Sequence, residues 1–546
     1  MSNQETANGT KRFAIDHGMA WPAVIIIIVL SIPLVIWEQR SLATLNAIFE
    51  VIVANFGWLY MWYPILMIVF GLYFVFSKYG KVVLGDPEDK PRFTMFQYMS
   101  IIIAMGIGST IMRTGSIQWA HVALNPPFGI EPLTSEALAW GNPYGMFLWN
   151  IHTFAIFSMT APAMGYVLYV RKKPLMRVSE ICRCVFGDRF TDGVGGKVLD
   201  ILFLVAIIAG SATFLGLGTP IVTAVVSKLF NIQVTFQLTL AVTLVWIALF
   251  TTSVYLGLEK GIKNLSTFNM YLAAFLGLFI VILGPTVFIL NHFTDSVGFL
   301  LVHMVDLTFY MDSLNIGEAA HISRFSVFWW AYCATWALLH GVFAAKISKG
   351  RTIRQMILVY FLAPLVLAWV ATGILGGAGI HAYLTGQVPV MEIITEGEGA
   401  MAAIAEIMGS LPLPTFVLLV FAVLTMIFFG TTLDSTTYSI AAYTDRHDMS
   451  KQDPTRSNRV LWAAVIAFMA LVLLRVGGLV PLEVTSGLLG FPIMFLQFVT
   501  VYAAKKMMDE DKAYIYNVRL DPIKEAQRRI AEGEDPRAVA GDSVEY

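Results

Sequence analysis

Long runs of apolar residues, separated by short polar stretches, follow one another along the chain. A helix that crosses a membrane needs about 20 mostly apolar residues, and each run is long enough to form one. The pattern predicts an all-α integral membrane protein with about 12 transmembrane helices. The predicted spans begin near Trp21, Val51, Met95, Tyr144, Lys197, Phe236, Leu265, Ser326, Arg354, Leu413, Arg459 and Thr485.

The basic residues gather in every second polar stretch. Lys and Arg favour the loops on the cytoplasmic side of a membrane. With the N-terminus inside, the outside loops carry few of the 36 Lys and Arg residues, namely Arg40, Lys228, Arg324 and Arg475. This asymmetry and the even number of spans predict a multi-pass protein of the cell inner membrane with both termini in the cytoplasm.

The polar segments divide the chain further. Two outside loops, 125–142 and 291–325, are longer than turns, and the amphipathic stretch Ser296–Tyr310 is expected to lie along the membrane surface. The first apolar run lacks a following small-residue cleavage site, so we interpret it as a retained helix. The expected divisions are a cytoplasmic N-terminal segment (1–20), a membrane domain (21–505) and a charged cytoplasmic tail (506–546) with a helix at Pro522–Glu532.

Composition excludes several classes of protein. The chain is 57% hydrophobic and only 13% charged, whereas soluble domains carry about a quarter charged residues, so its main solvent is the lipid bilayer. A net charge of -1 gives no reason to expect a nucleic-acid partner. The 3 cysteines are too few for a disulfide framework, and the pair Cys182 and Cys184 has no further ligands to form a metal site. No motif of an integral membrane enzyme is present, so we expect no catalytic residues and no enzyme.

Two polar islands interrupt the apolar runs. In the third span, Gly106 and Gly108 weaken the helix, which favours either a mid-membrane break that exposes backbone groups or close packing through small residues. In the tenth span, Thr431, Thr432 and Asp434 offer oxygen atoms that suit a hard cation such as Na⁺. Hydrogen bonding between helices is the alternative for the hydroxyls, but an acidic residue inside a span usually has a function.

Aromatic residues form a stripe in the eighth span. Trp329, Tyr332, Trp336 and His340 follow a three- and four-residue spacing, which places them on one face of a helix. Such a stripe can hold an organic cation by cation–π attraction, or it can be ordinary packing or an interfacial belt.

One basic residue, Arg113, falls within a span. A charge at this depth costs at least about 2.5 kcal/mol, so it should face a partner or a water-filled cavity. The partner is either structural, such as Asp434 or backbone carbonyls, or the carboxylate or sulfonate of a zwitterionic substrate. A guanidinium binds such an anion with two parallel hydrogen bonds.

These features together resemble the betaine/carnitine/choline transporter family. Lys346–Arg354 is similar to the signature that follows the tryptophan-rich helix in this family. Leu258–Lys263 is similar to the loop that precedes the seventh span of the family. Asn125–Pro132 and Phe293–Gly298 resemble the carnitine/γ-butyrobetaine antiporter branch in particular. The likeness covers roughly residues 20–505.

The resemblance implies two inverted five-helix repeats, spans three to seven and eight to twelve, after two leading helices. It also implies a homotrimer, with the surface helix at the subunit contacts, and a secondary active transporter that works by alternating access. The substrate would be a small methylated onium or zwitterionic solute of the betaine, carnitine, choline, methylamine or sulfonium type. A channel is the alternative of another class, but discrete binding positions and paired breaks in spans three and ten favour a carrier.

The resemblance also assigns the substrate site to spans three, four, eight and ten. This chain has Cys333 where the family usually has Trp, and Gln118, His121 and His340 where the antiporters have Glu, Tyr and Met; Phe154 lies near another antiporter Trp. Either the substrate head group differs from trimethylammonium, or Trp119, Trp149 and Trp336 rebuild the cage. The candidate substrate-binding residues are Trp149, Trp330, Tyr332, Cys333, Trp336, His340, Arg113, Gln118, Trp119 and His121.

Sodium coupling follows from the same resemblance. Sodium-dependent relatives have a hydroxyl pair in span ten, which Thr431 and Thr432 match, while carbonyl groups would come from Ile102, Met105 and Phe428. Sodium-independent antiporters carry an arginine in span seven, where this chain has Asn269. We therefore expect Na⁺ as the coupling ion and no other cofactor, with substrate/product exchange as the alternative.

Overall fold

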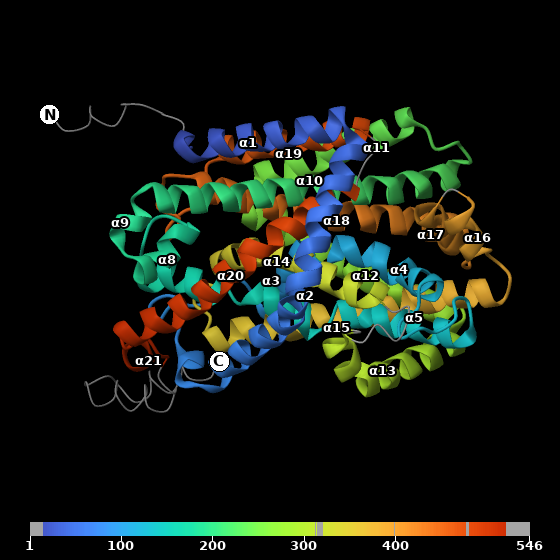
Figure 1. Cartoon of the computed structure of the whole chain (residues 1–546), viewed down its shortest axis with the longest axis horizontal. Helices are drawn as coiled ribbons and strands as arrows, with labels where there is room; N and C mark the ends of the chain where they lie inside the picture. Colours follow the sequence, from blue (N-terminus) through green and yellow to red (C-terminus); the bar gives the residue numbers. More distant parts are fainter. Residues whose placement is uncertain (1–14, 312, 314–319, 398, 477–479, 520–546) are drawn as a thin grey trace, which may run out of the picture.

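The computed structural model describes residues 15–311, 313, 320–397, 399–476 and 480–519, and these residues are mainly α-helical (Figure 1). Isolated bridges are the only β-structure in these ranges. The long helices are α1 (His17–Ile36), α2 (Glu38–Phe76), α10 (Val194–Phe230), α11 (Phe236–Leu256), α12 (Lys263–Leu283), α13 (Thr286–Phe309), α14 (Ala320–Ile347), α15 (Ile353–Leu384), α18 (Pro414–Thr444), α19 (Arg456–Val476) and α20 (Val480–Glu510).

The third and fourth predicted spans are built from several consecutive helices. They are α3 (Met95–Gly106), α4 (Gly108–Leu124), α5 (Ser135–Leu148), α6 (Ile151–Ser158) and α7 (Ala161–Gly165). Shorter helices lie in the connections: α8 (Val178–Phe186), α9 (Asp188–Thr191), α16 (Val390–Thr395), α17 (Ala400–Gly409) and α21 (Ala513–Tyr516). Each of the predicted span starts lies in one of the helices or directly beside one.

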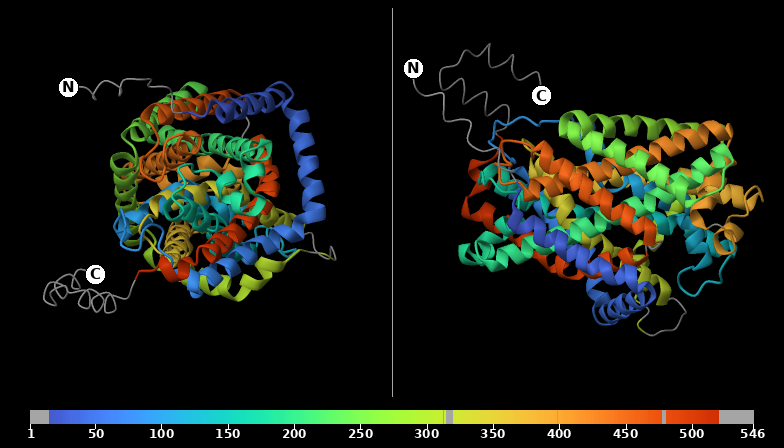
Figure 2. Two further views of the ribbon diagram at one scale, coloured as in Figure 1. Left: turned by 90° about the vertical axis from the view of Figure 1, so that its left-hand side faces the viewer. Right: turned by 90° about the horizontal axis from the view of Figure 1, so that it is seen from above.

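The helices confirm an all-α multi-pass membrane protein. In the described ranges, 9 helices are long and apolar enough to cross a membrane, or up to 10 if the bent pair α3 and α4 is one span. Contiguous apolar side chains such as Leu244, Phe275 and Leu362 are exposed on the outside of the bundle, as expected for a lipid-facing surface. The leading helices α1 and α2 lie at the periphery (Figure 2).

Helix α14 lies at the centre of the bundle, where it packs against α20, α6, α7 and α2. Nearly all of its side chains are buried from Val327 onward, because other helices surround it on every side. A second group of contacts joins α18 to α10, α11 and α12, and α15 to α4. This arrangement brings the polar island of α18 towards the bend between α3 and α4.

Local sequence signals explain where two of these helices begin. Thr94 and Gln97 form a reciprocal capping box at the start of α3, and Thr352 and Gln355 form another at the start of α15. In each, the threonine side chain accepts a hydrogen bond from a backbone N–H that has no partner within the helix, while the glutamine side chain accepts from the threonine N–H.

Both described chain ends lie at one end of the bundle, which we call the terminal face. Ile15 pairs with Asp445 there, and Val82 pairs with Val518. Arg171 binds Glu510 and Asp511 with N–O distances of 2.7 and 2.8 Å. The beginning of the charged tail is therefore bound to the loops of this face.

Several predicted boundaries differ from the structure. Ser135–Asn142, expected in a loop, is the first half of α5, and α20 continues to Glu510, beyond the predicted end of the membrane domain. The amphipathic stretch expected from Ser296 onward is the second half of α13, which begins at Thr286. The expected break in span ten is wrong, because α18 is one continuous helix. The tail helix predicted at Pro522–Glu532 lies outside the described residues.

Candidate functional site

The third span is broken at the glycine pair. Helix α3 ends at Gly106, and the axis bends by 59° before α4 continues the span. A Cβ atom on Gly106 would lie 2.1 Å from Cε1 of His340, so only glycine allows the central helix α14 to approach this closely. The break and the close packing, which the sequence left as alternatives, occur together here.

The hydroxyl groups of α18 face this break. Thr432 Oγ1 donates to the carbonyl oxygen of Ala104 at 2.9 Å and lies 3.0 Å from the carbonyl oxygen of Phe428 in its own helix. Thr431 Oγ1 approaches the Ile427 and Phe428 carbonyls at 3.0 and 2.9 Å. Spans three and ten therefore meet at Thr432 through the carbonyl of Ala104, which the sequence analysis did not name, and the predicted donors Ile102 and Met105 lie on the same helix.

Four aromatic side chains from two spans form a continuous row, which we call the aromatic cluster. The ring of Trp149 lies 5.0 Å from that of Trp329, Trp329 lies 5.9 Å from Tyr332, and Tyr332 lies 6.3 Å from Trp336. All four are more than nine-tenths buried. This row has the spacing and polarity to surround the apolar face of an onium group.

Backbone and side-chain hydrogen bonds fix the orientation of this cluster. Trp149 follows the last residue of α5, and its Nε1 donates to Thr114 Oγ1 of α4 at 2.9 Å. Trp329 Nε1 donates to the carbonyl oxygen of Leu148 at 2.9 Å, which the interruption between α5 and α6 leaves available. Thr114 of α4 and the interruption of span four therefore hold the rings in position.

The structure replaces one predicted cluster residue with its neighbour. Trp330 packs against the rings of Phe147 and His152 and is not adjacent to Trp149. Trp329, absent from the candidate site residues, contacts Trp149 instead. The three-residue spacing between Trp329 and Tyr332 was the signal that could have identified it.

His340 and Cys333 lie on the same side of α14, at different positions along the helix. The His340 ring stacks on Phe157 with a centroid distance of 4.0 Å and an interplanar angle of 10°. Cys333 is buried with its sulfur 3.8 Å from Thr153 Oγ1. Cys333 therefore contacts span four through a small side chain, and His340 connects the aromatic cluster to the break in span three.

Three residues of α4 that were predicted to bind the substrate lie outside the aromatic cluster. Trp119 packs between Gly141 of α5 and Gly379 of α15, so it does not rebuild the cage. Gln118 lies against Gly145 of α5. His121, in the last turn of α4, is close enough to Arg113 for their charges to interact.

Arg113 is half-buried on α4, one residue before the threonine that binds Trp149. The ion pair with Asp434 that the sequence left open is not formed. Neither carboxylate oxygen of Asp434 has a hydrogen-bond partner within the described ranges. The hydroxyl of Ser253 lies beside the carboxyl group, outside hydrogen-bond geometry.

Asn269 lies on the buried side of α12, which packs against both α3 and α18. Its side-chain oxygen and nitrogen have no hydrogen-bond partner among the residues that the structure describes. A neutral amide therefore occupies the position at which the antiporter branch would carry a cation.

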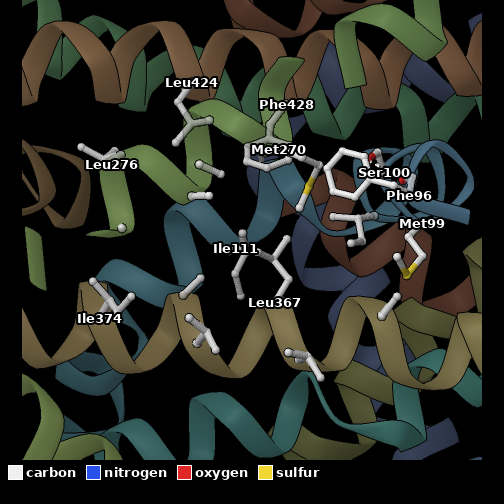
Figure 3. A pocket seen from close by; sticks show the side chains of 18 of the residues that line it. Phe96, Met99, Ser100, Ile111, Met270, Leu276, Leu367, Ile374, Leu424 and Phe428 are labelled. Carbon is white, nitrogen blue, oxygen red and sulfur yellow. Dashed lines mark hydrogen bonds between the residues drawn. The ribbon is translucent and has the colours of Figure 1, made fainter. Parts of the chain in front are cut away.

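A cavity of about 880 Å³ lies between α3, α4, α12, α15 and α18 (Figure 3). Its wall includes Phe96, Met270, Leu367 and Phe428, and Ser100 is a rare polar member. Such a lining suits an acyl chain better than a charged solute. The aromatic cluster, in which the indoles of Trp149 and Trp329 are hydrogen-bonded, is the better candidate for substrate binding.

Comparison with protein families gives one match. The sequence model described as BCCT, the betaine/carnitine/choline family transporter, matches residues 19–513. The match includes α1 to α20 and with them both halves of the candidate site.

Proposed function

The chain belongs to the betaine/carnitine/choline transporter family, and from this premise we propose Na⁺-coupled uptake of a small methylated onium or zwitterionic solute. Membership means secondary transport of a betaine-, carnitine- or choline-type substrate across a membrane. The coupling ion, the direction and the residues that bind the solute are the proposal. The terminal face is proposed to be cytoplasmic, in the cell inner membrane, because it carries most of the basic loops.

The contact between Thr432 and Ala104 carries the proposal for sodium. It joins a hydroxyl of α18 to a carbonyl beside the break in span three, and Phe428 contributes a second carbonyl at 3.0 Å. Neutral oxygen atoms without a nearby fixed cation suit a hard monovalent ion. Asn269 supports this reading, since an arginine at its position would supply the charge that Na⁺ brings. Ile102 and Met105, on the same buried segment of α3, are proposed as further carbonyl donors.

The aromatic cluster is proposed to hold the substrate head group. Trp149, Trp329, Tyr332 and Trp336 present π faces to an onium group, which is attracted to them electrostatically. Because Cys333 stands where relatives have Trp, the cluster leaves more space beside α14. Arg113 on the neighbouring α4 is proposed to bind the anionic end of a zwitterion.

Uptake into proteoliposomes tests the coupling. We expect uptake to require an inward Na⁺ gradient and Thr432→Ala to weaken its dependence on Na⁺. The matched control is Ser439→Ala, because Ser439 donates only to a carbonyl of its own helix. Equal rates in Na⁺ and K⁺ buffers would contradict the proposal and make substrate exchange the better mechanism.

A thermal-shift screen of the purified protein identifies the substrate class. Betaine, choline, carnitine, γ-butyrobetaine, trimethylamine, its oxide, dimethylsulfoniopropionate and taurine would each be added with and without Na⁺. A ligand that stabilises the folded protein raises its melting temperature, and coupling predicts a larger shift when Na⁺ is present. No stabilisation by any methylated onium compound would overturn the proposed substrate class.

A further inference from the structure

A buried carboxyl group lies in the middle of α18. Asp434 has 0% of its surface exposed, and neither of its carboxylate oxygens has a hydrogen-bond partner in the described part of the chain. An ionised carboxylate that is fully buried, without a counter-charge or a hydrogen bond, is strongly disfavoured. The same group is tolerated when it is neutral, and a bound proton makes it neutral.

The neighbouring polar groups suit a proton better than a metal cation. Ser253 of α11 is the one polar side chain known to lie beside the carboxyl group, and its hydroxyl also lacks a partner among the described residues. A protonated carboxyl group needs one acceptor, which this hydroxyl can supply after a small rotation. A metal cation would need several oxygen ligands around it.

No charged side chain in the part of the chain that the structure describes is bonded to Asp434. The Nη1 of Arg459 on α19 donates to the carbonyl of Val254, next to Ser253 in the chain, at 2.6 Å, and Arg459 is not bonded to Asp434. The other ionisable side chains that the structure describes on helices around this part of α18 do not bond to Asp434 either. With Arg459, they are Tyr98, Arg113, Tyr255, Lys263 and His340.

Asp434 lies between the proposed ion site and the terminal face. Thr431, Asp434 and Tyr438 follow a three- and four-residue spacing and so share one face of α18. The Tyr438 hydroxyl donates to Asp453 at 2.6 Å, and Asp453 also lies 3.4 Å from Arg92 and 3.9 Å from Lys346. These contacts join α18, α14 and the segment before α3 between Asp434 and the terminal face, and the arrangement in which they are formed is called closed below.

We propose that Asp434 is a proton-binding site, protonated in this closed arrangement and deprotonated when the contacts of Asp453 open. An O–H bond at one carboxylate oxygen breaks on opening, and its proton passes to water that enters from the terminal face. Closure expels the water, and the carboxylate takes up a proton from it before it is buried again. Protonation of Asp434 in the closed arrangement requires neither the proposed substrate nor Na⁺, so this half of the proposal can be tested apart from both.

Infrared spectroscopy of the full-length protein in lipid tests the first half of this proposal. A protonated carboxyl group has a carbonyl stretching band that a carboxylate lacks. We expect this band in the wild type at neutral pH and its loss in Asp434→Asn. Asp448→Asn is the matched control, because that carboxylate is bound by Ser450 and Lys451 within its own loop and should not contribute. A band unchanged in Asp434→Asn, or absent from the wild type, would overturn the proposal.

A second variant keeps the test valid if Asp434→Asn does not fold. Ser253→Ala retains the carboxyl group and removes its nearest acceptor, so the band should move without disappearing. Proton release is then measured with a pH-sensitive dye in proteoliposomes during transport. Proton movement in the wild type that is lost in Asp434→Asn supports release, whereas a wild type that moves no protons contradicts it.

Discussion

At the scale of single residues, the candidate site depends on rings held by hydrogen bonds and on one very close approach. Thr114 and the Leu148 carbonyl orient Trp149 and Trp329, and Gly106 allows His340 to reach the break in span three. Each of these contacts can be removed with one substitution. Their effects on ligand binding and on stability should therefore be separable.

Trp336→Ala should weaken substrate binding, because it removes one wall of the aromatic cluster. The loss of one cation–π contact corresponds to about 0.5 to 2 kcal/mol, or about a two- to thirty-fold increase in Kd. Isothermal titration of the purified protein measures it. Trp119→Phe is the control, because Trp119 packs between α5 and α15 and should leave the affinity unchanged. An unaltered Kd in a folded Trp336→Ala protein would exclude this residue from the cluster's function.

Arg113→Lys should separate two classes of ligand. Lysine keeps the charge but loses the planar fork that binds a carboxylate with two hydrogen bonds. We expect the affinity for a zwitterion such as betaine to fall by about tenfold, the equivalent of one charge-assisted hydrogen bond, while choline is little affected. Competition binding with both ligands measures the ratio. Equal losses for the two ligands would assign Arg113 a structural role.

Gly106→Ala should destabilise the protein, because the added methyl group would overlap the His340 ring. Overpacking of this kind costs about 1 to 3 kcal/mol of folding free energy. Thermal unfolding followed by fluorescence measures the change. The double variant Gly106→Ala and His340→Ala should recover part of the loss, since the space is then available. If both variants are equally unstable, the overlap is not the cause.

At the scale of elements, the bundle is closed by loops that meet at the terminal face. Asp453, in the connection between α18 and α19, joins Tyr438 of α18, Lys346 of α14 and Arg92 before α3. Burial alone would raise the pKa of Asp453, but the Tyr438 hydroxyl and the two basic side chains outweigh it and hold the pKa below its ordinary value. The stabilisation that ionised Asp453 gives to the folded protein is therefore complete above the ordinary carboxyl pKa of about 3.9. It is lost only as the pH falls through the lower pKa that Asp453 has in the folded state.

Asp453→Asn should favour opening of the terminal face at neutral pH, because it removes the charge that faces Arg92 and Lys346. Labelling of cysteines introduced along this face would be faster than in a wild-type background. Asp448→Asn is the control, since Asp448 binds Ser450 and Lys451 within the same loop and joins no other helix. Labelling rates that do not differ between the two variants would show that Asp453 does not keep the face closed.

At the scale of the whole molecule, α13 presents apolar side chains to its surroundings. Leu301, Val302 and Val305 are 61%, 75% and 66% exposed on this helix. An apolar stripe of this kind suits either lipid or another subunit, and the proposed homotrimer assigns it to subunit contacts.

Val302→Asp should break the proposed trimer, because it places a charge in an apolar contact. The mass of the purified complex, measured by light scattering with correction for detergent, should fall from three subunits to one. Leu249→Asp on α11 is the control, because it changes another exposed apolar residue, 53% exposed, on a different helix. A trimer that survives Val302→Asp would place the subunit contact elsewhere.

The sequence by itself determined which segments are helices and which of them carry chemistry. Apolar runs are long because lipid is their solvent, so the span starts are readable without any tertiary information. Glycines, hydroxyls and aromatic residues stand out against that background for the same reason. The glycine pair of the third span and the hydroxyl groups of the tenth are such exceptions.

Only the tertiary structure decided which neighbour each helical face meets. Spacing places Trp329 and Trp336 on one side of α14, but the position of α5 decides that Trp329, and not Trp330, contacts Trp149. The same holds for Trp119, which packs between two other helices, and for Asp434, which forms no pair with Arg113. The physical reason is that helical periodicity fixes the direction of a side chain relative to its own axis alone. The crossing of the helices then determines its partners.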